Sequence, residues 1–254
     1  MERFVRLLVT SAAGLLPAAG LRAASAAGSA PIWTVASVAL ATAALVAGWP
    51  ALARLPQPHS ARLTLALTGA VAITLATLRP GDPAAVLVAI ALGFPAVFVR
   101  ELTRPAPRDD LVRSVSGTTC GVIAVAAMGL WVTAGRMEHF LDLAVLAGVG
   151  IATACLVLGL SRLLPDRPWR PEAGALAAPV IAAGGGAAAS LLVVTHWWAG
   201  AAVAAACAVA PAAIWLLGDP KGLGEGPPRW RDAALATLPL AVAAVPVWTA
   251  ALIR

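Results

Sequence analysis

The feature that most constrains this chain is a series of eight long apolar runs, separated by short stretches rich in proline, glycine and charge. A helix needs about 20 mainly apolar residues to cross the hydrocarbon layer of a bilayer. The runs are continuously apolar and do not alternate, so they predict helices and not the strands of a membrane barrel. The eight predicted spans are residues 32–49, 62–78, 84–99, 111–133, 140–160, 173–195, 198–217 and 233–253.

The composition agrees with this prediction. Hydrophobic side chains make up 60% of the chain and charged side chains 12%, whereas soluble domains carry about 25% charged residues. So little charge cannot cover a globule of this size with polar surface, which excludes a soluble enzyme, and such hydrophobicity excludes a disordered chain. The fold class expected is therefore all-α: a polytopic membrane helical bundle of about eight spans.

The basic residues predict an orientation. Most of the 18 lysines and arginines fall in the first, third, fifth and seventh connections between the runs. The side of a membrane protein richer in such residues faces the cytoplasm. The arginines occur singly between apolar runs and form no stripe, so we expect no nucleic-acid partner. The expected location is the plasma membrane, with the bilayer itself as the main partner.

The N-terminal segment, residues 1–31, is expected to be amphipathic or weakly inserted in the membrane. It has a basic start, an apolar stretch interrupted by Arg6, and a run of small residues. Three interpretations stay open: a cleaved signal peptide, an additional span, and a helix lying in the membrane interface. A crossing segment would move Arg3 and Arg6 to the arginine-rich side, which favours a crossing or half-inserted segment.

Tryptophans occur near the ends of the predicted spans, which is typical of the belt that these amphipathic rings form at membrane interfaces. The tryptophans concerned are Trp33, Trp49, Trp131, Trp198, Trp215 and Trp248.

The chain also shows a weak internal repeat with an offset of about 116 residues. Pro95 in the third run corresponds to Pro211 in the seventh, and Trp131 corresponds to Trp248 with a small gap. This pattern predicts two membrane halves, residues 32–134 and 135–254, each with four spans. Because an even number of spans gives both halves the same orientation, the repeat is of the parallel kind, whose interface is a natural place for a pathway.

The paired prolines are the first candidate site. A proline inside a span frees a carbonyl one turn earlier, and paired breaks in two halves are a sequence indicator of a transporter's binding site. The most polar stretch inside any span opens the fourth run, and its hydroxyl groups either contact a ligand or bond their own helix carbonyls. The substrate-binding residues predicted on these grounds are Phe94, Pro95, Ser116, Thr118, Thr119 and Pro211.

Small residues in the spans predict close helix packing. Gly117 and Gly121 form a GxxxG pattern, and Gly184–Gly186 interrupt the sixth run. Such residues let helix backbones approach where lipid supplies no hydrophobic drive for association. Lining of a cavity is the alternative, and packing is favoured.

Few residues predict metal or proton chemistry, because charge inside the spans is almost absent. His139, Asp142 and His196 could bind a metal or relay a proton, but the interface position that we expect for them explains them as well. The three cysteines lie inside apolar runs at spacings that fit no metal site, so we expect small buried side chains and no cofactor. These cysteines are Cys120, Cys155 and Cys207.

The third connection carries the pair Asp109–Asp110 beside Arg104, Arg108 and Arg113. Carboxylates and arginines in such a loop could bind Mg²⁺ and a phosphorylated lipid head group. The longer acidic signatures of intramembrane transferases are missing, so these arginines are interpreted as setting topology.

Two stretches, GWPALARLP and DDLVRSVSGTTCGVIAVAA, resemble uncharacterised multi-pass membrane proteins of high-GC actinobacteria. The resemblance implies a polytopic plasma-membrane protein and carries no activity. The function predicted is a small permease-like transporter of a metabolite or lipid, and a non-enzymatic role is favoured. The alternatives are a membrane scaffold or accessory subunit, with a membrane-protein partner or a second copy of the chain, and an enzyme acting on a lipid phosphate.

Overall fold

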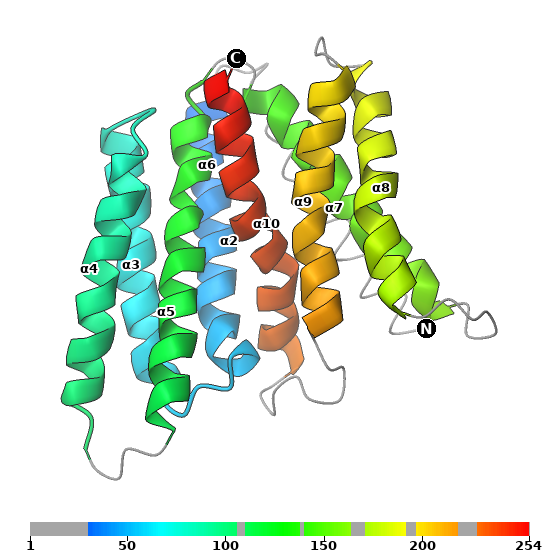
Figure 1. Cartoon of the computed structure of the whole chain (residues 1–254). Coiled ribbons are helices and arrows are strands. Elements are labelled where there is room, and N and C mark those ends of the chain that lie inside the picture. Colours follow the sequence, from blue (N-terminus) through cyan, green and yellow to red (C-terminus); the bar gives the residue numbers. More distant parts are fainter. Residues whose placement is uncertain are drawn as a thin grey trace. The chain divides into compact units, whose positions relative to one another are not determined.

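The computed structural model describes residues 30–105, 110–137, 140–163, 171–191, 197–217 and 228–253. Within these residues the chain is α-helical and contains no strand (Figure 1). The predicted N-terminal segment, apart from its last two residues, lies outside the described residues. The helices are α2 (Ala30–Leu52), α3 (Pro58–Leu78), α4 (Ala84–Leu102), α5 (Leu111–Ala127), α6 (Gly129–Ala134), α7 (Phe140–Leu163), α8 (Pro171–Ser190), α9 (Trp197–Leu217) and α10 (Pro228–Ile253).

Seven of the eight apolar runs lie in one of these helices or, for the fourth run, in α5 and α6 together, whereas α8 covers the sixth run only as far as Ser190. Among the described residues, four helical segments are long and apolar enough to cross a membrane: Ile32–Leu52, Pro58–Leu78, Ala84–Leu102 and Leu111–Ala134. The later helices contain shorter apolar segments. The all-helical class is therefore confirmed, and several apolar helices fit an integral membrane protein. The count of eight spans and the four-plus-four duplication stay predictions.

The helices group into two compact units. The first contains Pro31–Arg136 and Leu223–Ala244, and therefore α2 to α6 with the first part of α10. The second contains α7, α8 and α9, together with the end of α10.

The first unit buries small and branched apolar side chains between α2, α3, α4 and α5, with Leu45, Leu65 and Val122 fully buried. Large apolar side chains also cover its outside, where Leu40 is 74% and Leu87 65% exposed. A soluble monomer rarely exposes apolar surface on this scale, whereas lipid solvates it without cost. The outside of the unit therefore suits a bilayer.

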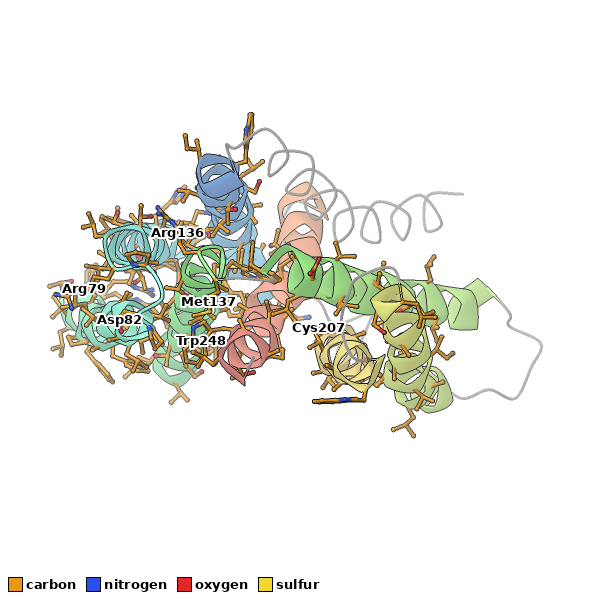
Figure 2. The ribbon with its side chains drawn as sticks, turned by 90° about the horizontal axis from the view of Figure 1, so that it is seen from above. Arg79, Asp82, Arg136, Met137, Cys207 and Trp248 are labelled. Atoms are coloured by element: carbon orange, nitrogen blue, oxygen red, sulfur yellow. The ribbon has the colours of Figure 1, made fainter. Side chains whose placement is uncertain are left out.

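Charged side chains of the first unit gather at the ends of its helices. Figure 2 looks onto one of these ends, where Arg79, Asp82 and Arg136 lie. Arg79 and Asp82 belong to the turn between α3 and α4, and Arg136 follows α6. The opposite end carries the turn between α2 and α3 and the connection from α4 to α5.

The GxxxG pattern of α5 packs against α2 and α3. A Cβ atom added at Gly117 would lie 2.7 Å from Leu55, and one at Gly121 would lie 2.9 Å from Leu65 and closer still to the indole of Trp49. The indole Nε1 of Trp49 donates a hydrogen bond to the carbonyl of Gly117 (2.8 Å). The packing role predicted for this pattern is confirmed, since larger side chains would displace α2.

Two of the tryptophans predicted for the interfacial belt are instead part of the interior. Trp49 and Trp131 are each only 8% exposed. The Nε1 of Trp131 donates to the carbonyl of Leu240 in α10 (2.9 Å), in the same unit. The belt prediction is wrong for these two residues, whereas Trp33 and Trp198 are more than half exposed and fit it.

The second unit is packed through small residues. Cβ atoms added at Gly150 of α7 or Gly186 of α8 would collide with backbone atoms of α9, at Ala204 and Gly200 respectively. Only glycine allows backbones to approach so closely. The packing role predicted for Gly184–Gly186 holds for Gly186 and Gly185, whereas a Cβ at Gly184 would meet nothing within 4 Å.

Candidate functional site

The α4–α5 hairpin of the first unit carries a row of buried side chains on α4. The first members of this row are apolar, and the last is charged. On α4 the buried positions Ala89, Gly93, Val97 and Glu101 follow one another at intervals of four residues. Positions four apart share one face of a helix. The stripe that packs against the rest of the unit therefore ends on a carboxylate, which is only 4% exposed.

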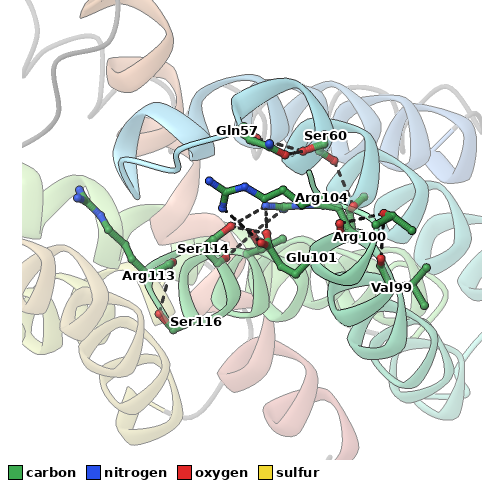
Figure 3. A network of polar contacts seen from close by, with 12 residues as sticks. Gln57, Ser60, Val99, Arg100, Glu101, Arg104, Arg113, Ser114 and Ser116 are labelled. Atoms are coloured by element: carbon green, nitrogen blue, oxygen red, sulfur yellow. Dashed lines mark hydrogen bonds and ion pairs between the residues drawn. The ribbon is translucent and has the colours of Figure 1, made fainter. Parts of the chain in front are cut away.

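Glu101 is the centre of a network of polar side chains (Figure 3). Its Oε1 accepts hydrogen bonds from Arg100 Nη2 and Ser114 Oγ, and its Oε2 pairs with Arg104 Nη1 at 3.4 Å. Arg100 also donates from Nη2 to Ser114 Oγ (2.7 Å) and from Nη1 to Thr118 Oγ1 (2.9 Å). The Arg100 and Arg104 side chains are only 9% and 8% exposed. The network therefore ties the end of α4 to the first two turns of α5.

The hydroxyl groups on α5 are oriented by their own helix. Thr118 Oγ1 donates to the carbonyl of Ser114 (2.7 Å), which leaves its lone pairs to accept from Arg100. Ser114 and Thr118 are both fully buried. Buried charges are stabilised where hydrogen bonds satisfy them, and here the Glu101 carboxylate accepts from Arg100, Arg104 and Ser114.

A groove lies on the same hairpin, with a volume of about 590 Å³. Its walls come from α4 and from the first three turns of α5, and its lining is almost entirely apolar, with two hydroxyl groups. We refer to it as the α4–α5 groove; it is lined by Phe94, Phe98, Leu111, Val112, Val115, Ser116 and Thr119.

The two walls of the groove are held together at both ends. At one end, a Cβ atom on Gly93 would lie 2.6 Å from Val122 Cγ1, so glycine is needed for α4 to reach α5 there. At the other end, Glu101 and Ser114 join the same two helices through the network. The groove is therefore bounded by close helix packing at one end and by the polar network at the other.

The predicted substrate-binding residues divide between these features. Phe94, Ser116 and Thr119 line the groove. Thr118 lies in the polar network, and Pro95 is exposed and is not part of the lining.

The paired prolines do not end their helices. α4 continues through Pro95 to Leu102, and α9 continues through Pro211 to Leu217. Pro211 belongs to the second unit.

The expectation that buried charge is almost absent is wrong for the end of α4, because the third run was ended at Val99, immediately before the first charge. The helix continues to Leu102. Extending the buried interval of four residues from Val97 would have placed Glu101 inside. Ser114 and Thr118 are also four residues apart on α5, and this spacing indicated a polar face of α5 that a charged residue of a neighbouring helix could meet.

Two loop predictions are changed by the structure. Arg104 was considered among the loop residues that could contact a lipid head group and was interpreted as setting topology, but it is buried against Glu101. Asp110 precedes α5 in a left-handed conformation (φ 55°) and is exposed, whereas Asp109 and Arg108 lie outside the described residues. Of the two carboxylates considered for Mg²⁺ binding, the structure therefore describes only Asp110.

The other candidates for metal chemistry gain no support. His139 and His196 lie outside the described residues. No group of three potential metal ligands occurs within the described part of the chain. Cys207 is buried as predicted, but Cys120 is exposed, so the prediction of a buried thiol is wrong there. Of the side chain of Cys155 the structure gives no description.

Comparisons with known proteins identify no relative of this chain. No protein-family model, curated protein or solved structure matches the chain.

Proposed function

We propose that this chain is an integral membrane protein of the permease-like class whose ligand is a lipid, bound in the α4–α5 groove. The observation that carries the proposal is the lining of the groove. Phe94 and Phe98 face apolar residues of α5 across it, on a hairpin whose helices are long and apolar enough to cross a membrane.

The chemistry of the lining favours a lipid over a polar metabolite. A polar ligand that enters an apolar groove loses its hydrogen bonds to water, and Ser116 and Thr119 offer only two hydroxyl groups in return. The more polar side chains of the hairpin, around Glu101, are bonded to one another. An acyl chain would replace lipid contacts with packing against aromatic rings at little cost.

The distribution of charge supports an orientation for this proposal. The network end of the first unit carries Arg54, Arg62, Arg100, Arg104 and Arg113. The end shown in Figure 2 carries Arg79 and Arg136. The positive-inside rule therefore favours the network end, and the nearby groove, on the cytoplasmic side of the plasma membrane.

A tryptophan placed in the groove tests the proposal. Ser116 is exposed and lines the groove, so Ser116→Trp is expected to fill it without disturbing the core. Wild-type protein purified in mild detergent should retain a lipid that native mass spectrometry detects, and Ser116→Trp should lose most of it. In reconstituted vesicles, the rate at which a fluorescent phospholipid moves between leaflets should also be lower for Ser116→Trp than for the wild type.

Leu67→Trp is the matched control, because it adds the same ring to an exposed position of α3 outside the groove. This variant should retain as much lipid as the wild type and should move the fluorescent phospholipid between leaflets at the same rate. Equal lipid retention by both variants, or a co-purified protein in place of lipid, would refute the proposal. Retained lipid without movement would leave binding in place and reject the permease class.

A further inference from the structure

We infer that the α4–α5 groove holds a lipid of one leaflet only, the leaflet at the network end, with the acyl chain directed toward the centre of the bilayer. This inference rests on the proposed function, because it states from which leaflet the same groove takes its lipid. The observations that carry it are the depth of the groove along both helices and the packing that closes its inner end.

The groove reaches the same depth on both of its walls. On α4 the innermost residue of the lining is Phe94, eight residues before the helix ends at Leu102. On α5 the innermost residue is Thr119, eight residues after the helix begins at Leu111. Eight residues of helix correspond to roughly 12 Å at 1.5 Å per residue. One leaflet contributes about 15 Å of the hydrocarbon core, so a groove of this depth ends before the bilayer centre.

Charged residues mark the outer end of the groove as the level of the membrane interface. On α4 the first charges are Arg100 and Glu101, close to the end of the helix. On α5 the charges are at the start, where Asp110 precedes the helix and Arg113 lies in its first turn. Charged side chains are costly inside hydrocarbon, whereas those near helix ends reach the interface. A lipid beside the apolar lining would therefore have its head group at the network end.

The inner end of the groove is closed by helix packing. A Cβ atom on Gly93, which directly precedes Phe94, would lie 2.6 Å from Val122 Cγ1. The glycine lets α4 and α5 approach closely at this level, which leaves no room for a chain between them. At the network end the helices are joined instead through the long side chain of Glu101, which reaches Ser114. Because the side chains at a contact set the spacing of two helices, the groove is wider toward the interface than toward the bilayer centre.

A groove of this shape admits an acyl chain from one side. A chain of the opposite leaflet could approach only with its methyl end, and only at the end that is closed. By the positive-inside rule the favoured leaflet is the cytoplasmic one. The groove is therefore the place where the protein takes up or releases a lipid on that side, and passage to the other leaflet requires a different part of the chain.

Two phosphatidylcholines that differ only in the position of a diazirine on one acyl chain test the inference. One carries the diazirine close to the ester and the other carries it close to the methyl end. Each is photo-crosslinked to the full chain in nanodiscs, and the adducts are mapped by peptide mass spectrometry. The first lipid should label mainly Leu111 and Val112, and the second mainly Phe94 and Thr119. Labelling of the same residues by both lipids, or the reverse order, would overturn the inference.

Thr119→Trp blocks the inner end of the groove alone. It should lose most of the adducts that the methyl-end probe forms on Phe94, and it should keep those of the ester probe, because the outer part stays open. Thr74→Trp is the matched control, since it makes the same substitution at an exposed position of α3 outside the lining. It should be labelled like the wild type. Equal loss of both kinds of adduct in Thr119→Trp would contradict entry from the network end.

The proposed function and this inference fail in different ways. If Ser116→Trp removes the adducts of both lipids but their order along the groove is reversed or absent, only the inference fails. If Ser116→Trp leaves the adducts of both lipids unchanged, the proposed function fails as well.

Discussion

Glu101→Gln is expected to lower the free energy of unfolding by about 3 kcal/mol, because it removes the only carboxylate from a buried pair of arginines in the described network. An amide keeps the size of the side chain but cannot neutralise Arg100 and Arg104. The loss can be measured as a shift in denaturant unfolding in detergent. The groove should loosen with it, since the network joins its two walls.

Asp110→Asn is the matched control for this prediction. It removes the same charge at the same end of the first unit, from an exposed residue whose left-handed conformation asparagine tolerates. We expect a change below about 0.5 kcal/mol, as for other surface substitutions. Equal effects of the two substitutions would mean that Glu101 is solvated and that the network does not hold the hairpin.

Gly186→Ala is expected to destabilise the second unit by about 3 kcal/mol, at the upper end of the cost of overpacking. The added Cβ would collide with Ala204 and with the backbone of Gly200, and backbone cannot move aside as a flexible side chain can. α8 and α9 would have to separate. Thermal unfolding in detergent, and the distance between spin labels on α8 and α9, would report this.

Gly184→Ala, two residues earlier, should not lower the stability of the second unit. A Cβ at Gly184 meets no atom within 4 Å, and alanine has the higher helix propensity by up to about 1 kcal/mol. This variant should be neutral or more stable than the wild type. If both alanines were tolerated alike, the close approach of α8 and α9 would not be present in the protein.

The helices of this protein were predictable because the signals for them are local. Apolar runs set the spans, and charge gathers in the connections, so each predicted run coincides with an observed helix over most of its length. The packing of Gly121 was also predictable, since a GxxxG pattern marks a face that needs small residues. Which helix would meet that face, here α2 with Trp49, was not.

The site was predicted only in part, because its geometry depends on which faces of α4 and α5 meet. Phe94, Ser116 and Thr119 were selected for a proline and for polarity, and the structure places all three along one groove. Glu101 was missed because a hydropathy pattern ends a span at the first charge, whereas tertiary packing continues past it. Trp49 was misjudged for a related reason: a ring at the end of a run faces lipid or protein according to partners far away in sequence.

The most direct test of the account is photo-crosslinking with a phospholipid that carries a diazirine near the middle of one acyl chain, added at less than one lipid per protein and mapped by peptide mass spectrometry. The account predicts adducts concentrated on Phe94, Phe98 and the stretch from Val112 to Thr119, and their loss in Ser116→Trp. Adducts spread evenly over exposed positions such as Leu63 and Leu67 of α3, and unchanged in that variant, would contradict it.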